Sequence, residues 1–303
     1  MSESGYVGRF APSPTGRLHM GSLVAAVASW CDARYHGGRW LVRMEDLDPP
    51  REVPGAADDI LRTLEAFGLH WDDEVVFQSR RHEHYLAALQ ELHEQGRVFP
   101  CACSRKELSG QSVYPGYCRD GLSPGRNGRS ERFSFHAGTW SWRDAVQGEQ
   151  DFDAELLGDF VVRRADGLWA YQLAVVVDDI AQGVNAIVRG ADLLDSTPRQ
   201  LALRAALAPE FPVSDWAHLP ILVNAENQKL SKQTLAAPID PEQGGSHLLS
   251  ALEILGQPVE DLRGEDQGNL EELLNRAAAH WDIRKVPMGP IHWQGEGQGA
   301  GRA

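Results

Sequence analysis

The stretch GRFAPSPTGRLHMGS, residues 8–22, joins a strand expected over 6–11 to a helix expected over 22–35. In an open parallel sheet, ligands bind at the carboxyl ends of the strands, where helix N-termini present free N–H groups suited to phosphate. Gly21 in such a turn lets a base or a phosphate approach the backbone, and His19 can donate to a phosphate oxygen. The stretch predicts a nucleotide site, although a turn with a solvent-exposed histidine is the commoner form of an isolated HxGS.

Strands and helices alternate through the first hundred residues. Further strands are expected at 40–45 and 75–79, and helices at about 55–67 and 80–95. Strands separated by helices are typical of α/β proteins with a doubly wound parallel sheet. We therefore expect a Rossmann-type domain.

Sheet-like sequence resumes at 159–180, where Asp166-Gly167 between two apolar runs predicts a hairpin turn. The other elements expected here are strands at 186–190 and 218–223, a helix capped by Ser196 or Thr197, and mainly helical sequence from 233 to about 282. The last residues, 294–303, are typical of a frayed tail.

The composition favours a soluble, cytoplasmic protein. Hydrophobic residues make up 42% and charged residues 24% of the 303 residues, and no apolar run approaches the roughly 20 residues that span a bilayer. The first residues, MSESGYVGR, lack a basic segment followed by an apolar one, so neither export nor a membrane is expected. The net charge of -14 argues against a protein that coats nucleic acid through bulk charge, but allows a local basic surface.

Three of the four cysteines crowd into a Gly-, Pro-, Ser- and Arg-rich stretch, 99–158, which we expect to be an insertion. They are Cys101, Cys103 and Cys118, with Tyr114 and Tyr117 in the intervening loop. Three thiolates plus one further ligand satisfy tetrahedral zinc, and four protein ligands make a closed, structural site. Three unrelated reduced cysteines are the alternative. The fourth cysteine, Cys31, is expected to be a small buried apolar residue.

A second polar loop, NAENQKLSKQ at 224–233, follows an expected strand. It places Lys229 and Lys232 on either side of Ser231. Two lysines in a loop are usually just solvated charge, but this arrangement also suits the charge that builds up on a triphosphate during reaction.

Together, PSPTGRLHMGS and KLSKQ resemble the two signature sequences of class I aminoacyl-tRNA synthetases. Within that class, GRFAPSPTGRLHMGS, VRMEDLDPPR at 42–51 and RGADLLDSTPRQ at 189–200 resemble the glutamate-specific branch. The resemblance covers roughly 5–235. Members that charge tRNA continue through a large anticodon-binding domain, which 236–303 is too short to provide. The chain is therefore similar to the short paralogues of this branch, which attach glutamate to the queuosine base in the anticodon of tRNA(Asp).

The resemblance implies which residues bind each substrate. L-Glutamate would contact Arg9, Ala11, Ser13, Glu45, Tyr171 and Arg189. ATP would be held by Thr15, His19, Gly21, Lys229, Ser231 and Lys232, with His19 and Lys232 catalytic and a magnesium ion bridging phosphate oxygens. Tyr114 would complete the zinc site of Cys101, Cys103 and Cys118.

The chemistry of the residues agrees with a glutamate pocket. Arg9 and Arg189 sit at the ends of expected strands, and arginine recognises carboxylates in a bidentate manner. Glu45 offers a carboxylate for the amine. Glutamine would leave the charge of Arg189 unpaired, so this residue is the one expected to give specificity.

We therefore expect four segments: the first half of a Rossmann-type catalytic domain at 1–98, an inserted zinc-containing module at 99–158, the second half with the lysine loop at 159–235, and a mainly helical C-terminal segment with a flexible tail at 236–303. The expected partner is tRNA(Asp) carrying queuosine, bound by a monomer.

Basic side chains in and after the cysteine segment could bind RNA phosphates locally, although a run of basic residues is more often a solvated loop. They are Arg105, Lys106, Arg119, Arg126, Arg129 and Arg132. Two other functions remain open at this point. One is a minimal glutamyl-tRNA synthetase that charges an acceptor end, and the other is a non-catalytic RNA-binding paralogue.

Overall fold

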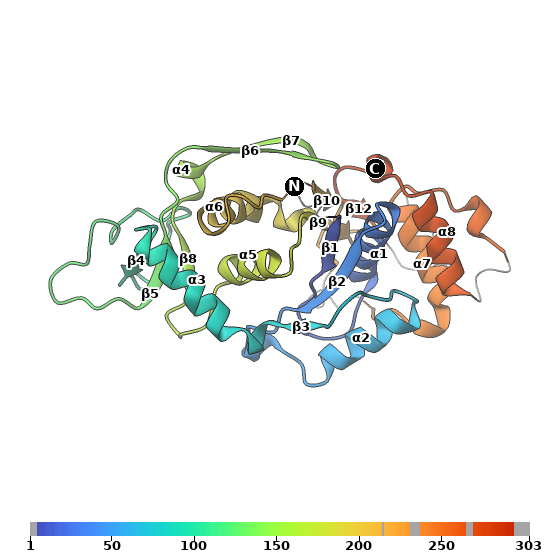
Figure 1. The fold of residues 1–303 in the computed structure, drawn as a ribbon, viewed down its shortest axis with the longest axis horizontal. Coiled ribbons are helices and arrows are strands. Elements are labelled where there is room, and N and C mark those ends of the chain that lie inside the picture. Colours follow the sequence, from blue (N-terminus) through green and yellow to red (C-terminus); the bar gives the residue numbers. More distant parts are fainter. Residues whose placement is uncertain (1–4, 214, 231–236, 265–268, 294–303) are drawn as a thin grey trace.

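The computed structural model describes residues 5–213, 215–230, 237–264 and 269–293. Its first half contains a parallel sheet of β1 (Val7–Phe10), β2 (Arg39–Met44) and β3 (Val76–Phe77), in the order β1-β2-β3. Helix α1 (Met20–Tyr35) connects β1 to β2, as the alternation of the sequence predicts (Figure 1).

Two later strands form a separate parallel pair that lies beside β1. Strands β9 (Ala186–Gly190) and β10 (Asp215–Leu219) pair in parallel. The Asn185 N–H, just before β9, donates to the Val7 carbonyl at 3.1 Å, while Arg9 and Arg189, near the ends of the same strands, lie close enough to interact electrostatically. Because both the starts and the ends are neighbours, β9 runs alongside β1 in the same direction. Strands β2 and β3 follow β1 on one side, whereas β9 and β10 lie on its other side. The order in which strands are added therefore reverses between β1 and β9, and ligands bind at this position in such folds.

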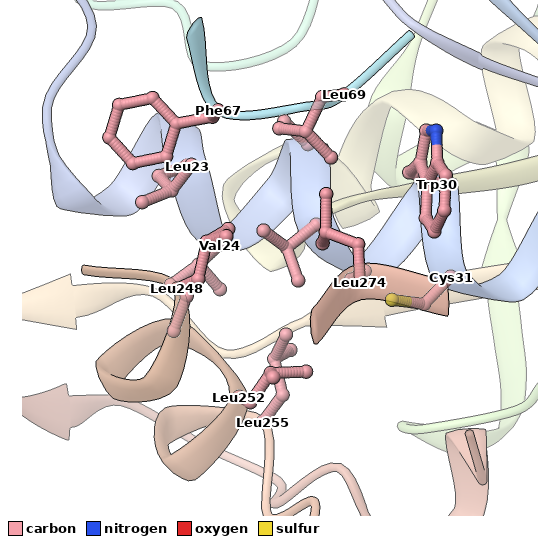
Figure 2. Packing of buried hydrophobic residues seen from close by; sticks show 14 of the residues in the cluster. Leu23, Val24, Trp30, Cys31, Phe67, Leu69, Leu248, Leu252, Leu255 and Leu274 are labelled. Carbon is pink, nitrogen blue, oxygen red and sulfur yellow. The ribbon is translucent and has the colours of Figure 1, made fainter. Parts of the chain in front are cut away.

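Helix α1 is buried on most of its surface. Its sequence, MGSLVAAVASWCDARY, carries small and apolar side chains around nearly the whole circumference, as a helix covered on several sides must. Figure 2 shows Val24 of α1 near Leu248 of α7 and Cys31 of α1 near Leu274 of α8, all in one core cluster. Cys31 is fully buried, as expected, and burial raises the pKa of its thiol.

Three further helices lie where the sequence predicts them: α2 (Ala56–Ala66), α3 (His82–Glu94) and α6 (Thr197–Leu207). Helix α6 begins after Ser196 and has Pro198 in its first turn.

The sheet-like interpretation of 159–180 is right for its first part and wrong for its second. Phe160–Arg163 forms strand β8, and the Arg164 N–H donates to the Leu168 carbonyl across the expected turn. From Tyr171 the chain forms helix α5 (Tyr171–Ala181) instead of a second strand. A run of β-branched residues resembles a strand in isolation, but here it packs in one core with α3 and α6, and tertiary burial overrides local preference.

The inserted region has two antiparallel parts. Strands β4 (Val98–Cys101) and β5 (Ser130–Phe133) form a sheet with β8, in the order β4-β5-β8. Strands β6 (Thr139–Asp144) and β7 (Gly148–Asp153) form a long hairpin, followed by the one-turn helix α4 (Ala154–Leu157). This hairpin reaches back to the parallel sheet (Figure 1), where the Ala145 N–H donates to the Trp216 carbonyl at 2.8 Å.

The C-terminal segment is mainly helical, as predicted, with α7 (Gly244–Ile254) and α8 (Leu270–Ala279). It also contains a strand that the sequence did not indicate. Strand β12 (Ile291–His292) pairs in parallel with β11 (Leu222–Val223), which lies just before the loop at 224–233. The tail expected at 294–303 lies outside the described residues. Across the described ranges, every helix is too short or too polar to cross a bilayer.

Asp178 of α5 joins three elements through one buried carboxylate. It accepts hydrogen bonds from Gln78 Nε2 at 2.8 Å, Arg81 Nε at 2.5 Å and Tyr85 Oη at 2.8 Å, and Arg43 Nε of β2 lies 3.9 Å away. The Asp178 side chain is 0% exposed. It therefore ties α5 to α3 and to β2.

We expect Asp178→Asn to lower the free energy of unfolding by about 3–5 kcal/mol, because it leaves the buried Arg43 with less compensating charge and replaces an acceptor oxygen with a donor. Chemical denaturation measures the change. Asp73→Asn, which removes an exposed ion pair with Arg39, is the matched control and should change stability little. Equal stability of the two variants would contradict the role of Asp178.

Candidate active site

Charged side chains lie close together at the carboxyl ends of β1, β2 and β9. Arg9 of β1 and Arg189 of β9 are both buried, 3% and 5% exposed. Glu45 follows β2, and Tyr171 begins α5. All four are close enough that Arg9, Glu45 and Tyr171 each influence the pKa of Arg189. The structure thus brings together four of the six residues expected to contact glutamate.

The remaining two, Ala11 and Ser13, lie on the chain that leaves β1. Ala11 is half-buried and Ser13 is exposed. Between them, the Pro12 carbonyl accepts from the Glu45 N–H at 2.9 Å. This contact holds the segment against the end of β2, beside the four charged and aromatic residues.

Burial shifts the pKa values of the ionisable groups in this cluster. Burial raises the pKa of Glu45, while Arg43 and Arg9 act in the opposite direction. Burial also raises the pKa of Tyr171, against the opposing effects of Arg189 and Arg9. The Tyr171 phenol is therefore neutral and can act as a hydrogen-bond donor.

Two charged residues that the sequence analysis did not single out complete the balance of charge. Asp179 Oδ1 accepts from Arg9 Nε at 3.2 Å and from Arg43 Nη1 at 2.7 Å. Burial by itself would raise the pKa of Asp179, but Arg9 and Arg43 outweigh it and the pKa falls. Arg43 also contacts Glu45 Oε1 at 3.3 Å. The sequence signal for both residues was a charged side chain beside apolar ones, Arg43 in VRME and Asp179 in VVVDD.

Arg189 differs from Arg9 and Arg43 in its partners. Its guanidinium donates to His218 Nε2 at 3.0 Å, Gln200 Oε1 at 2.7 Å, Thr197 Oγ1 at 2.9 Å and the Leu193 carbonyl at 3.3 Å. Within the described residues these acceptors are all neutral. A buried cation bound only to neutral groups is the setting in which an anionic ligand gains most. The site can therefore receive a carboxylate.

The predicted nucleotide end is built on the start of α1. His19 is the N-cap residue: its Nδ1 accepts from the Ser22 N–H at 3.3 Å, and its Nε2 lies 3.3 Å from Ser22 Oγ. With Nδ1 as the acceptor, Nε2 carries the proton that a phosphate oxygen could accept. A Cβ placed on Gly21 would lie 3.1 Å from the His19 ring, so a larger residue would press on it.

The described parts of the lysine loop lie beside this helix start. The Leu230 carbonyl is 4.0 Å from a Cβ placed on Gly21, and the Ile239 N–H donates to the Leu18 carbonyl at 3.0 Å. Lys229 Nζ contacts Asp192 Oδ2 at 2.5 Å, just after β9. Ser231 and Lys232 lie outside the described residues. Thr15 is in the turn before α1, where its N–H donates to the Ser13 carbonyl at 2.8 Å.

The cysteine cluster forms a separate site at the end of β4. The Sγ atoms of Cys101, Cys103 and Cys118 all lie within 4.8 Å of one another. Cys103 and Cys118 are 3.6 Å apart, and Tyr114 Oη lies 3.5 Å from Cys101 Sγ and 3.8 Å from Cys103 Sγ. Tetrahedral zinc with bonds of about 2.3 Å separates its sulfur ligands by about 3.8 Å. These side chains therefore fit a metal ion, and they include the tyrosine that the family resemblance implies.

Arg132 supports the thiolates. Its Nε donates to Cys101 Sγ at 3.4 Å, and its guanidinium stacks 4.0 Å above the Tyr114 ring. Burial would raise the pKa of Cys101, but hydrogen bonds from Tyr114, the Cys103 backbone and Arg132 outweigh it and lower the pKa to about 7. The cluster therefore holds at least one thiol that ionises readily, as metal binding requires.

The basic residues of this region fall into two groups. Arg119 pairs with Asp159 and Arg126 pairs with Glu107, so together with Arg132 they hold the inserted region together. The other three are exposed and line a surface hollow of about 630 Å³: Arg105, Lys106 and Arg129. Arg132 and Arg164 line the same hollow, so this surface offers charge to a phosphate backbone.

Comparison with known proteins identifies the family of the chain. Residues 6–113 and 132–246 match the family described as tRNA synthetases class I (E and Q), catalytic domain; the unmatched stretch between them contains Tyr114 and Cys118. The glutamyl-Q tRNA(Asp) synthetase of Chromobacterium violaceum is 55% identical over 299 residues, which cover 96% of this chain and 98% of the relative. That of Dechloromonas aromatica is 51% identical over 295 residues, 94% of this chain and 96% of the relative.

Solved structures resemble the whole fold. A glutamate tRNA ligase of Elizabethkingia meningosepticum superimposes with a TM-score of 0.81 at 21% identity, over 96% of this chain and 67% of that one. The glutamate-tRNA synthetase of Elizabethkingia anophelis has a TM-score of 0.79 at 21% identity, over 97% of this chain and 69% of that one. These two likenesses concern the fold, whereas the sequence match concerns the family. The chain belongs to the class I (E and Q) tRNA synthetase family, and within it groups with the glutamyl-Q tRNA(Asp) synthetases.

Proposed function

We propose that this protein activates L-glutamate with ATP and transfers it to the queuosine base in the anticodon of tRNA(Asp). The observation that carries the glutamate part is Arg189, a buried guanidinium whose described hydrogen-bond partners are neutral, opposite Arg9 and Glu45. The side-chain carboxylate of glutamate would supply the anionic partner. The queuosine part is supported by the names of relatives that share half the sequence over nearly the whole chain.

In the first step, an oxygen of the glutamate α-carboxylate attacks the α-phosphorus of ATP, the bond to the bridging oxygen breaks, and pyrophosphate leaves. Glu45 would hold the ammonium group, and Arg9 and Tyr171 would orient the substrate, with the backbone at Ala11 and Ser13 closing the pocket. His19 and Lys232 would stabilise charge on the phosphates, while Thr15, Gly21, Lys229 and Ser231 would shape the ATP site. Magnesium bound with ATP would neutralise part of the triphosphate charge. Catalysis would come from positioning and charge stabilisation.

In the second step, a hydroxyl of the modified base attacks the carbonyl carbon of the adenylate. The bond between this carbon and the phosphate oxygen breaks, AMP leaves, and its phosphate takes up the hydroxyl proton. An ester of glutamate with the base results. Neither step requires a covalent bond to the protein.

We propose zinc as the ion of the cysteine cluster, held by Cys101, Cys103, Cys118 and Tyr114. Bound there it would cross-link the loop that follows β4. The Cys118 N–H donates to Tyr114 Oη at 2.9 Å, a contact that would stabilise a phenolate ligand. We propose the four segments expected from the sequence as the domain organisation. We also propose that the protein acts as a monomer in the cytoplasm.

The exposed basic group, Arg105, Lys106 and Arg129, is the proposed contact for tRNA phosphates. It lies in the same inserted region as the cysteine cluster, so the metal would hold the RNA-binding surface in shape. The acidic remainder of the chain would repel RNA elsewhere and direct it to this face.

The transfer reaction tests the proposed function directly. With radiolabelled glutamate and ATP, we expect label to enter tRNA(Asp) that carries queuosine and not tRNA(Asp) that lacks it. Equal labelling of both, at the acceptor end, would identify a minimal glutamyl-tRNA synthetase. Absence of any glutamate-dependent ATP–pyrophosphate exchange would identify a non-catalytic paralogue.

Lys232→Ala tests the lysine loop. Because a cation near the phosphates stabilises charge that develops during the reaction, we expect the rate of ATP–pyrophosphate exchange to fall by about 100-fold or more with no change in thermal stability. Lys285→Ala, on the exposed surface of the C-terminal segment, is the matched control. Exchange at the wild-type rate in Lys232→Ala would remove the loop from the mechanism.

Metal analysis of the purified protein tests the zinc site. We expect one zinc per chain, lost in Cys118→Ser together with a lower midpoint of thermal unfolding, because the remaining ligands no longer close the tetrahedron. Cys31→Ala, which changes the cysteine outside the cluster, should retain the zinc. A wild-type protein that contains no zinc after purification without chelators would refute the proposal.

A further inference from the structure

A buried chain of hydrogen bonds leads from Arg189 into the inserted region. Arg189 Nε donates to His218 Nε2 at 3.0 Å, and His218 Nδ1 lies 2.5 Å from Asp144 Oδ2. The side chains of His218 and Asp144 are both 0% exposed. His218 belongs to β10, whereas Asp144 ends β6 of the long hairpin.

The chemistry of the donors determines which nitrogen of His218 carries the proton. A guanidinium nitrogen can only donate, so Nε2 must be the unprotonated acceptor. The proton is then on Nδ1, which donates to Asp144. This orders the chain as carboxylate, neutral imidazole and guanidinium.

Asp144 is itself held rigidly. Its Oδ1 accepts from the backbone N–H groups of Val146 at 3.0 Å, Gln147 at 2.9 Å and His218 at 3.1 Å. The ring of His218 stacks on Trp216 with an interplanar angle of 4°, and the Arg189 guanidinium lies 5.3 Å from the Trp216 ring centroid. Every group that defines the orientation of Arg189 on this side is therefore fixed by packing or by hydrogen bonds.

We propose that His218, oriented by Asp144, is a positioning residue that fixes the Arg189 guanidinium for the side-chain carboxylate of glutamate, and so contributes to the discrimination of glutamate from glutamine. The inference rests on the proposed function of the Arg189 pocket. It assigns to the β6-β7 hairpin a role in selecting the amino acid, although the hairpin lies in the inserted region.

Protonation of His218 would break this arrangement, because Nε2–H would then face the Nε–H of Arg189. The charged groups that face the imidazole are Asp144 from β6, Arg189 from β9 and Arg9 from β1. Burial lowers the pKa of His218, and Arg189 and Arg9 lower it further, while Asp144 opposes them. The imidazole therefore remains neutral at neutral pH and becomes charged only in acid, below its ordinary value of about 6.5.

Asp144→Asn provides the sharpest test, because it preserves shape while presenting an amide N–H to His218 Nδ1. The proton of the ring would move to Nε2, the wrong nitrogen for Arg189. In ATP–pyrophosphate exchange we expect the KM for glutamate to rise about tenfold or more, the KM for ATP to stay unchanged, and the preference for glutamate over glutamine to fall. Asp151→Asn, on the exposed side of the same hairpin, is the matched control.

His218→Gln and His218→Ala separate positioning from packing. Glutamine retains an oxygen that can accept from Arg189, so we expect it to restore much of the glutamate affinity that alanine loses. In the wild type the KM for glutamate should rise only in acid, as the pH falls through the lowered pKa of His218, and in His218→Gln this part of the pH dependence should be absent. Equal losses in both His218 variants, with an unchanged pH profile, would show a structural role only.

A measurement on the wild-type protein does not depend on the stability of any variant. ¹⁵N NMR of labelled histidine, with the His218 signals identified by their absence in His218→Gln, should show the Nδ1–H form at neutral pH. An Nε2–H form would overturn the proposal. Wild-type exchange that does not depend on glutamate would refute the proposed function itself, whereas normal wild-type exchange with an unchanged glutamate KM in Asp144→Asn would refute only the positioning role.

Discussion

The fold depends on how it accommodates arginine side chains buried between β1, β2 and β9. A buried guanidinium is costly unless it is paired, and α5 supplies the pairing through Asp178 and Asp179. Tyr171 lies seven and eight positions before these aspartates, so helical periodicity places all three toward the same side. Helix α5 therefore neutralises one part of the pocket while leaving Arg189 with neutral partners. Under the proposed function, this electrostatic contrast between the two parts would favour binding of a dicarboxylic amino acid.

The sequence predicted correctly the features that follow from the order and spacing of residues along the chain. The alternation of strands and helices indicated the parallel sheet, and the ends of its strands correctly located Arg9, Glu45 and Arg189 near one another. The close spacing of Cys101 and Cys103 likewise indicated a cluster, because a short loop leaves few ways to separate them. The cysteine spacing follows from local geometry, whereas Arg9 and Arg189 come together because the carboxyl ends of parallel strands meet at one edge of the sheet.

The features that were missed depend on contacts between distant segments. A run such as AVVV has no clear periodicity, so only its packing against α3 and α6 decides that it is a helix. Asp144 and His218 are 74 positions apart, and nothing in either segment indicates that they meet. The same holds for β12, which is too short to be recognised without its partner β11. The role of Lys229 and Lys232 at the ATP phosphates stays a prediction, and of the two only Lys229 lies within the described residues.

The pairing of β11 with β12 has a consequence for synthesis of the protein on the ribosome. The Trp293 N–H donates to the Val223 carbonyl at 2.9 Å, and His292 Nδ1 lies 3.1 Å from the Asn224 carbonyl at the start of the lysine loop. The nascent chain emerges from its N-terminus, so Val223 leaves the exit tunnel long before residues 291–293. Until those residues emerge, β11 lacks its parallel partner strand β12. The strand that leads into the lysine loop is therefore completed only after residues 291–293 have been synthesised.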